Sequence, residues 1–489
     1  MKKESSPVLE LIRDVIALDR KNKDFPIYMQ IAQRIMVLIQ NQSIAQGDFL
    51  PGTRALAELL KVHRKTIIAA IEFLSEEEYV EILPNKGAKV SYVRIEIGNR
   101  SIENSQSIIE KAPYFISKNR ILETEQLPSN ASYFWNDGIL DERLFFEKFA
   151  TKKNDLFFEN ASTQKMQNAY RFLSFQYLKY IHSSQNLNIA EENILLVNSL
   201  SLAIEMLLEV LISAGDCVVT TNPGAYKVNM LLQQKGVLVK TVPMTTVDGI
   251  DLSSLKNIHA KNKIKLLYLE PQAHYPTTSE LSLIQRIAIL QFAQENEIII
   301  LENSSEGALS FSNKSVPSLY ALDEFGWVIQ VNSLEKSVSA QLFSTYILGP
   351  NNLILELEKL YQYLNLFPVF GQIQFMTQLL QSQQLEKILT KNRKIYKLRR
   401  DHFFSKIAHL PIETILPKSG LAFWISFPWN IHLPKLKKSL AAQNVYLPDY
   451  CLFQSKDYHA LRLGYAHWDD DEQLAQITIL ERCLHVIGG

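Results

Sequence analysis

The chain has 489 residues, with 51 Lys and Arg against 51 Asp and Glu, and therefore a formal net charge of +0. This length exceeds one ordinary domain and suggests several folded units. The balanced charge excludes a global field that would draw the whole protein onto nucleic acid or a membrane, so any attraction to DNA must come from a local patch.

The three cysteines, Cys217, Cys451 and Cys483, lie far apart and form no C-x-x-C pair. This spacing argues against a disulfide framework and a thiolate zinc site, and it fits a reducing compartment. The apolar stretch near the N-terminus is interrupted by Glu10 and Arg13, which favours an amphipathic helix over a secretory leader. No apolar run is long enough for a membrane span. We therefore expect a cytoplasmic protein without a membrane partner.

The sequence divides into three zones. Residues 1–93 are locally basic and have helical patterns, and residues 94–129 are polar and without periodicity. Such a polar, aperiodic stretch is typical of a linker. In residues 130–489, apolar strands alternate with helical stretches. We therefore expect a multidomain protein: a small α+β domain, a linker and a large α/β domain.

The large zone contains apolar runs that predict strands beginning near Cys217, Val237, Ile264, Glu297 and Trp327. Most are continuous aliphatic runs, as expected when helices cover both faces of a sheet. Helical stretches lie between these runs, as in residues 282–296. This βαβ order predicts a mostly parallel sheet.

In the first zone, three successive segments carry apolar residues at helical spacing: Ile31, Ile35, Leu38 and Ile39; Leu56, Leu59 and Leu60; Ile67, Ile71 and Leu74. Thr53 can cap the second segment, and a short turn at Lys61 and Val62 leads into the third. Two short helices joined by such a turn form a helix-turn-helix. The following Asn85-Lys86-Gly87 sequence predicts a β-hairpin, which would be the wing.

The third of these helices begins with His63, Arg64, Lys65 and Thr66. Residues at this end of a helix-turn-helix reach base edges in the major groove, and a wing lysine such as Lys86 lies near the DNA backbone or minor groove. An alternative is that the basic residues form only a solvated face, as most charge runs do. The complete order of helix, turn, helix and wing favours binding to double-stranded DNA.

The motifs P-I-Y-x-Q-I, G-x-x-L-P-G-T-R-x-L-A and V-x-R-x-T follow one another between residues 26 and 66. They resemble the N-terminal domain of GntR-type transcriptional regulators. The resemblance implies that Arg54 and Arg64 contact DNA, that Thr66 contacts phosphate, and that Gly87 permits the turn of the wing. Lys61 stands where the family usually has a turn glycine, and it either accepts a strained backbone or adds a phosphate contact.

The segments GDCVVTTNPGAY, LLYLEPQAHYPTT, IIILENSSEGALSF, VNSLEKSVSAQLFSTYILG and LRLGYA resemble fold-type I aminotransferases in their order. A GntR-type reader followed by such a domain is similar to the MocR-type subfamily of bacterial regulators. The resemblance implies a fold-type I α/β domain that binds pyridoxal phosphate as an effector sensor and forms a homodimer.

Pyridoxal phosphate needs a lysine for its Schiff base, a carboxylate at its pyridine nitrogen, and hydrogen-bond donors with positive charge at its phosphate. By family position Lys336 is the lysine, and Tyr226 could stack on a ring. Other family positions carry different residue types: Asn303 for the carboxylate, Ser305 for a ring-contacting tyrosine, Phe343 for the phosphate-binding arginine, and Ser199 for the glycine before the phosphate-binding helix.

A neutral amide cannot stabilise a pyridinium as a carboxylate does, and phenylalanine carries no charge for a phosphate. We therefore expect the large domain to be a dimeriser, or a sensor for something other than pyridoxal phosphate, without catalytic residues or a metal. The alternative is a working pyridoxal-phosphate-dependent regulator or aminotransferase that uses Lys336. A third possibility is a scaffold that binds a protein partner through Ile108, Ile109 and Phe115 of the linker.

Arg462 in the segment LRLGYA matches the arginine that holds the substrate carboxylate in aminotransferases. A guanidinium binds a carboxylate through two parallel hydrogen bonds, so a small carboxylate or amino-acid effector could bind there. The alternative is a structural arginine that caps loop carbonyls. By family position His274 and Tyr275 line the mouth of the cleft. The acidic run from Asp469 to Glu472 predicts the start of a helix rather than a metal site.

Overall fold

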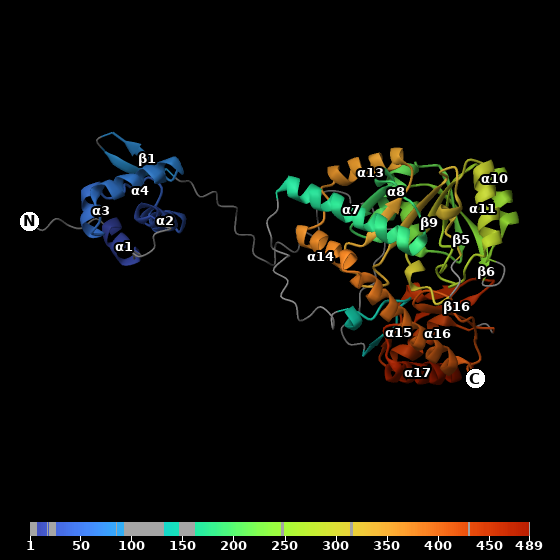
Figure 1. Cartoon of the computed structure of the whole chain (residues 1–489). Coiled ribbons are helices and arrows are strands. Elements are labelled where there is room, and N and C mark those ends of the chain that lie inside the picture. Colours follow the sequence, from blue (N-terminus) through green and yellow to red (C-terminus); the bar gives the residue numbers. More distant parts are fainter. Residues whose placement is uncertain are drawn as a thin grey trace, which may run out of the picture. The chain divides into compact units, whose positions relative to one another are not determined.

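The computed structural model describes residues 7–16, 18, 26–84, 86–91, 132–145, 162–245, 249–312, 316–428 and 431–488. The chain divides into two compact units, residues 1–117 and 118–489, which are both drawn in Figure 1. The predicted linker, with Ile108, Ile109 and Phe115, lies outside the described residues. The boundaries at residues 93 and 129 therefore stay predictions.

The N-terminal unit is a helical bundle closed by a hairpin. Its elements are α1 (Pro7–Val15), α2 (Ile27–Gln40), α3 (Thr53–Leu59), α4 (Arg64–Glu76), β1 (Val80–Leu83) and β2 (Gly87–Val90), and the two strands pair antiparallel. The predicted apolar stripes meet in one core, where Ile31, Ile35, Leu56, Ile67 and Leu74 are buried. The prediction of a winged helix-turn-helix is confirmed.

The second unit is built on a sheet with the strand order β4-β11-β10-β9-β8-β5-β6-β7. In that order the strands are Ile194–Val197, Thr345–Leu348, Val328–Ser333, Ile299–Asn303, Ile264–Leu269, Cys217–Asn222, Leu238–Thr245 and Gly249–Ile250. Strands β10, β9, β8, β5 and β6 are parallel, whereas β11 runs antiparallel to both of its neighbours and β7 runs antiparallel to β6. The predicted mostly parallel α/β sheet is confirmed.

Helices cover both faces of this sheet (Figure 1). Alternate residues of one strand point to opposite faces. In β4, Leu195 and Val197 join a core with α8, α9 and α13, while Ile194 and Leu196 join a core with α7 and α14. The covering helices are α7 (Thr163–Gln185), α8 (Leu200–Leu211), α9 (Tyr226–Gln234), α10 (Leu252–Lys261), α11 (Leu283–Glu295), α12 (Leu319–Leu322), α13 (Asn351–Tyr363) and α14 (Phe370–Gln381).

The C-terminal part of this unit has its own sheet, with the strand order β12-β13-β16-β15. These strands are Glu413–Thr414, Ala422–Ser426, His459–Gly464 and Leu452–Gln454, and a separate parallel pair joins β14 (Val445–Tyr446) to β3 (Tyr133–Phe134). They pack with α15 (Gln384–Ile407), α16 (Leu433–Ala441) and α17 (Asp470–Gly488) around an aromatic core. The acidic run begins α17, as predicted, and the backbone N–H of Glu472 donates to the Asp469 carboxylate at 2.9 Å.

The three cysteines are all buried, and none of them forms a disulfide in the described part of the chain. None of the described helices is both long enough and apolar enough to cross a lipid bilayer.

Candidate functional site

The first candidate site is the beginning of α4 in the N-terminal unit. His63 is the N-cap of this helix, and its Nδ1 accepts a hydrogen bond from the Lys65 backbone N–H at 3.2 Å. A side-chain acceptor at this position satisfies one of the free N–H groups of the first turn. Arg54, His63, Arg64 and Lys65 are all exposed, and Thr66 is half-buried. The side chains predicted to contact DNA are therefore accessible.

The Arg64 side chain is held against α3. Its Nε donates to the Thr53 hydroxyl at 3.1 Å. The predicted capping role of Thr53 is wrong, because Gly52 is the N-cap of α3 and no side chain caps that helix. Thr53 instead couples the two helices of the helix-turn-helix through Arg64, which fixes where this guanidinium projects.

Two residues with positive φ shape the turns around this helix. Gly87 at the start of β2 has a φ of 103°, which residues with a side chain rarely adopt, and Lys86 beside it is exposed. Lys61 in the turn between α3 and α4 has a φ of 50°. The expectation that Lys61 accepts a strained backbone is confirmed.

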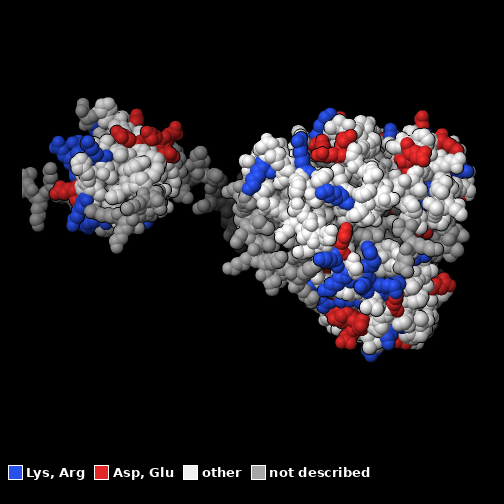
Figure 2. Space-filling model, in the orientation of Figure 1, with Lys and Arg blue, Asp and Glu red and all other residues white. Residues whose placement is uncertain are grey.

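Charge is distributed unevenly over the N-terminal unit (Figure 2). Lys and Arg gather on the side where α3 lies in Figure 1, whereas Asp and Glu gather near β1. Because the whole chain has a formal net charge of +0, this separation provides the local basic patch that binding to DNA requires.

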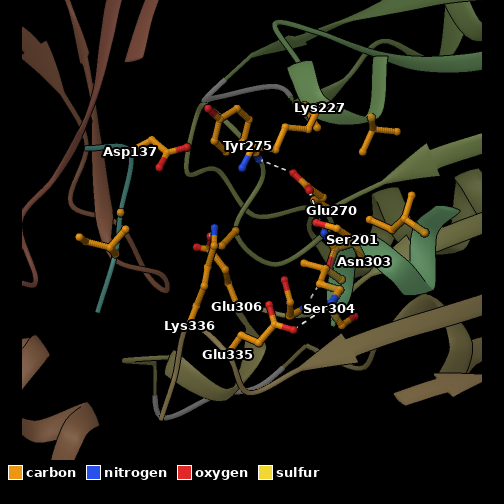
Figure 3. Close-up of a pocket in the computed structure, with 18 of the residues that line it drawn as sticks. Asp137, Ser201, Lys227, Glu270, Tyr275, Asn303, Ser304, Glu306, Glu335 and Lys336 are labelled. Atoms are coloured by element: carbon orange, nitrogen blue, oxygen red, sulfur yellow. Dashed lines mark hydrogen bonds and ion pairs between the residues drawn. The ribbon is translucent and has the colours of Figure 1, made fainter. Parts of the chain in front are cut away.

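The second candidate site is a cavity of about 570 Å³ in the larger unit. It lies where β8, β9 and β10 end and where α8 and α9 begin, because side chains that follow parallel strands meet at the same edge of a sheet. Of the predicted cofactor residues, Lys336, Asn303, Ser305 and Tyr226 line this cavity. Figure 3 labels Lys336 and Asn303 among the residues that line the cavity. Ser199, Phe343 and Arg462 are absent from its lining.

Lys336 forms an ion pair at the foot of the cavity. Its Nζ lies 2.7 Å from Oε1 of Glu306, and the same oxygen lies 3.4 Å from Nη2 of Arg462. Burial alone lowers the pKa of Lys336, but the carboxylates of Glu306 and Asp137 outweigh it and leave this pKa above its ordinary value. The ion pair therefore favours the ammonium form of Lys336, whereas a Schiff base forms from the neutral amine.

Arg462 is fully buried beneath the cavity. Its Nε donates to the Asp137 carbonyl at 2.7 Å and its Nη1 to the Pro276 carbonyl at 3.0 Å. Its guanidinium also lies 4.6 Å from the ring centroid of Tyr275. Loop carbonyls and Glu306 thus use its donors, so an effector carboxylate would have to displace Glu306 first. The carboxylate-binding role of Arg462 stays a prediction.

Asn303, at the end of β9, is tied to the neighbouring strand. Its Nδ2 donates to the Tyr268 hydroxyl and to Oε1 of Glu270, both at 3.0 Å, and its Oδ1 accepts the Ser305 backbone N–H at 3.1 Å. Burial raises the pKa of the Glu270 carboxyl. The amide at this position therefore serves a hydrogen-bond network between protein groups.

The N-terminus of α8 is occupied by a carboxylate from the same chain. Oε1 of Glu335 accepts the Leu200 backbone N–H at 2.9 Å and the Thr345 hydroxyl at 3.0 Å. Ser199 is the N-cap, and its hydroxyl accepts the Leu202 backbone N–H. Phe343 is buried in the core between α7 and the sheet. The N-terminus of α8 can thus bind an anion, and here the anion is the carboxylate of Glu335.

Sequence reasoning did not single out Glu270, Glu306 or Glu335. Two weak signals were available, since Glu335 directly precedes Lys336 and Glu306 closely follows Asn303. Glu335 pairs with Leu200 and Glu306 with Arg462, which lie far away in the chain. Local sequence patterns could not predict these pairings.

Aromatic rings form one wall of the cavity. Tyr226 stacks on Tyr450 at 5.8 Å with an interplanar angle of 6°, and its ring centroid lies 6.1 Å from that of Tyr275. The expectation that His274 lines the cleft is wrong, because its ring is buried between the hydroxyls of Thr221 and Thr277, at 2.8 and 2.7 Å. Among the residues that the structure describes, no group of three or more His, Cys, Asp or Glu could hold a metal ion.

Comparison with known families matches both units. Residues 150–476 match the family model of class I and II aminotransferases, and residues 27–90 match that of bacterial regulatory proteins of the gntR family. The chain belongs to the class I and II aminotransferase family. It carries in addition a gntR-type helix-turn-helix domain, which implies DNA binding. The aminotransferase family normally binds pyridoxal phosphate.

Two curated relatives align with this chain over nearly their whole length. An uncharacterized HTH-type transcriptional regulator, YisV of Bacillus subtilis, is 23% identical over 470 residues, which cover 91% of this chain and 93% of the relative. The HTH-type transcriptional regulator NorG of Staphylococcus aureus is 23% identical over 433 residues, which cover 85% of this chain and 95% of NorG.

Solved aminotransferase structures share the fold of the larger unit. A kynurenine aminotransferase of Pyrococcus horikoshii has a TM-score of 0.67 at 19% identity and covers 78% of this chain and 99% of its own. The α-aminoadipate aminotransferase LysN of Thermus thermophilus has a TM-score of 0.66 at 19% identity, with coverage of 77% and 98%. At this identity the similarity shows the fold alone.

Proposed function

We propose that this protein is a DNA-binding transcriptional regulator, and that its aminotransferase-like domain acts as an effector sensor and dimeriser and not as an enzyme. The observation that carries the proposal is the exposed basic beginning of α4, held by the winged helix-turn-helix. The relatives YisV and NorG are both named HTH-type transcriptional regulators, which supports it.

On this proposal, the DNA-binding surface consists of Arg54, His63, Arg64, Lys65, Thr66, Lys86 and Gly87. The first turn of α4 supplies base contacts, and the wing and α3 contact the backbone. The hydrogen bond from Arg64 to Thr53 supports a base-reading role for Arg64, because it restrains the side chain before DNA arrives.

The cavity residues, as arranged, do not fit pyridoxal phosphate. A phosphate at the N-terminus of α8 would meet the Glu335 carboxylate, and the nearby family position for a phosphate-binding arginine is the buried Phe343. At the pyridine nitrogen, Asn303 would offer a neutral amide, and Lys336 is held as an ammonium by Glu306. These features support a domain without transaminase activity.

The homodimer is part of the same proposal. Large apolar side chains are exposed on α7, where Phe172 and Phe175 are 46% and 49% exposed, and Tyr363 at the end of α13 is 87% exposed. Exposed apolar surface of this kind marks protein interfaces. A two-fold dimer would also present two recognition helices to a palindromic operator. A regulator of bacterial genes works where the chromosome is, so we place the protein in the cytoplasm.

Footprinting on the DNA that flanks the protein's own gene tests the regulator function. We expect a protected sequence at moderate salt, and we expect the protection to be lost in the variant Arg64→Ala. If the full-length protein protects no specific sequence when nonspecific competitor DNA is present, the proposal is wrong.

A further inference from the structure

The cavity of the larger unit carries an excess of negative charge. Its lining contains the carboxylates of Asp137, Glu142, Glu270, Glu306 and Glu335, but only the two ammonium groups of Lys227 and Lys336. Lys336 is already paired with Glu306, and Lys227 is exposed. A partly buried, unbalanced set of carboxylates attracts cations more strongly than the same charges would in water.

The positions that would hold an anionic ligand are taken by the chain itself. Glu335 accepts the N–H of Leu200 at the start of α8, and Glu306 lies between Lys336 and Arg462. A phosphate or carboxylate ligand would have to displace one of these glutamates into a cavity that is already acidic. The arrangement therefore disfavours anions.

Asp137 provides an available acceptor. Its side chain lies across the cavity from Glu270 and Asn303, near Tyr275 (Figure 3). Among the described residues, its carboxylate has neither a hydrogen-bond partner nor an ion-pair partner. Burial is the main cause that raises the pKa of Tyr275, and the Asp137 carboxylate raises it further. The negative charge of Asp137 therefore acts on the wall of the cavity that Tyr275 forms.

A second unsatisfied acceptor belongs to Glu306. This residue is 8% exposed, and its Oε2 is buried without a hydrogen-bond partner among the described residues, since both cationic contacts fall on Oε1. A buried carboxylate oxygen without a partner is costly and is usually explained by a missing donor. No described donor therefore neutralises this oxygen, and it adds to the negative charge beside the cavity.

The wall beside Asp137 suits the body of an organic cation. Tyr226 and Tyr275 meet there at an interplanar angle of 46°, so that their rings form a corner. Ile139, Leu140 and Leu231 add apolar surface to the lining. Aromatic faces attract ammonium groups through the ring quadrupole, and apolar surface accepts a hydrocarbon body.

We propose that this cavity binds a small organic amine that has no carboxylate or phosphate, with its ammonium group at Asp137 and its apolar or aromatic body against Tyr226 and Tyr275. The inference rests on the proposed effector-sensing function and names the chemical class of the effector. An amine donates hydrogen bonds to the Asp137 carboxylate and leaves Glu306 and Glu335 with their present partners.

Calorimetric titration of the full-length protein with three probes of similar shape tests this inference. The probes are 2-phenylethylamine, 2-phenylethanol and 3-phenylpropionate, which are cationic, neutral and anionic at neutral pH. We expect the amine to bind at least about tenfold more tightly than the alcohol, and the acid to bind most weakly. Equal or tighter binding of the acid, or no amine binding at millimolar concentration, would overturn the inference.

The variant Asp137→Asn tests the position of the ammonium group. We expect amine affinity to fall about tenfold while alcohol affinity stays unchanged, because the amide keeps the shape and loses the charge. The backbone carbonyl of Asp137 still accepts from Arg462 in this variant. The matched control is Glu324→Gln on the exposed surface outside the cavity, which should leave amine affinity unchanged. Unchanged amine affinity in Asp137→Asn would contradict the proposed position.

The inference and the proposed function can fail separately. If the protein protects no specific DNA, the regulator proposal fails whatever the cavity binds. If it protects DNA but all three probes behave alike, only the amine inference fails. The probe series uses unaltered protein, so it decides the question even if Asp137→Asn does not fold.

Discussion

At the level of single residues, the cavity is set by side chains that pair with one another. Glu306 lies between Lys336 and Arg462, with oxygen-to-nitrogen distances of 2.7 and 3.4 Å. The two cations lower the pKa of Glu306 below its ordinary value, even though burial acts to raise it. A buried charge that has lost one partner is strongly unfavourable, so the three residues depend on one another.

Arg64 carries the sharpest prediction for DNA binding. We expect Arg64→Ala to weaken binding to the operator by about 1–3 kcal/mol, because a bidentate contact with a base would be lost. Fluorescence anisotropy with labelled operator DNA measures this change. The matched control is Arg34→Ala on the exposed surface of α2, which should change the affinity little. A similar loss in both variants would show that Arg64 contributes only general charge.

His274 makes the larger unit sensitive to acid. Burial, aided by the charge of Arg462, lowers its pKa from 6.5 to about 3. The unfolded chain therefore binds a proton at higher pH than the folded one, and stability is lost as the pH falls from about 6.5 towards 3. At pH 5, protonation of this histidine in the unfolded chain alone lowers the free energy of unfolding by on the order of 2 kcal/mol.

Melting temperatures at pH 7.5 and pH 5 test this effect. We expect the difference between the two temperatures to be smaller in His274→Gln than in the unaltered protein, because glutamine does not titrate. An equal difference in both proteins would show that other groups cause the acid sensitivity.

The resemblance to fold-type I aminotransferases placed Lys336 and Asn303 at one site, and each of them follows an apolar run that predicts a strand. Parallel strands bring such residues to the same edge of the sheet. The pairing of Glu306 with Arg462 could not be predicted in this way, since the two residues are 156 positions apart in the chain. Which carboxylate turns towards which cation depends on packing between the two sheets of the larger unit.

At the level of elements, the sequence predicted the wing hairpin and the central strands of the large sheet, but it missed other short strands of the larger unit. The strands β5, β8, β9 and β10 are rich in aliphatic residues and bury most of their side chains on both faces. The strands β4 and β11 have only four residues each, and sequence reasoning missed both. A short apolar run does not distinguish a strand from a segment of buried helix. Sequence reasoning also missed the C-terminal sheet, in which β12 and β15 contain only two and three residues.

The turn between α3 and α4 can be stabilised. Lys61 has a φ of 50°, a conformation that costs a residue with a Cβ about 1 kcal/mol relative to glycine. We therefore expect Lys61→Gly to slow hydrogen exchange in α4 of the full-length protein. The exposed Glu72 lies inside α4, where glycine is unfavourable, so Glu72→Gly should speed exchange in the same helix. Changes of the same sign in both variants would contradict this account of the turn.

At the level of the whole molecule, the chain joins a helix-turn-helix unit to an aminotransferase-like unit and has a formal net charge of +0. Its attraction to DNA rests on the basic side of the N-terminal unit. Binding by such a surface releases counterions from DNA, and this release favours binding less as the salt concentration rises. We therefore expect operator affinity to fall steeply with salt concentration, while amine binding in the cavity changes little. These two salt dependences would show that the two surfaces work by different contacts.

We propose that the aminotransferase-like unit has kept the fold of its family and has lost the side chains that fit pyridoxal phosphate. Visible absorbance of the full-length protein during titration with pyridoxal phosphate tests this claim most directly. We predict no saturable new band, because Glu335 holds the N-terminus of α8 and Glu306 holds Lys336 as an ammonium group. A saturable band that disappears in the variant Lys336→Ala would contradict the claim.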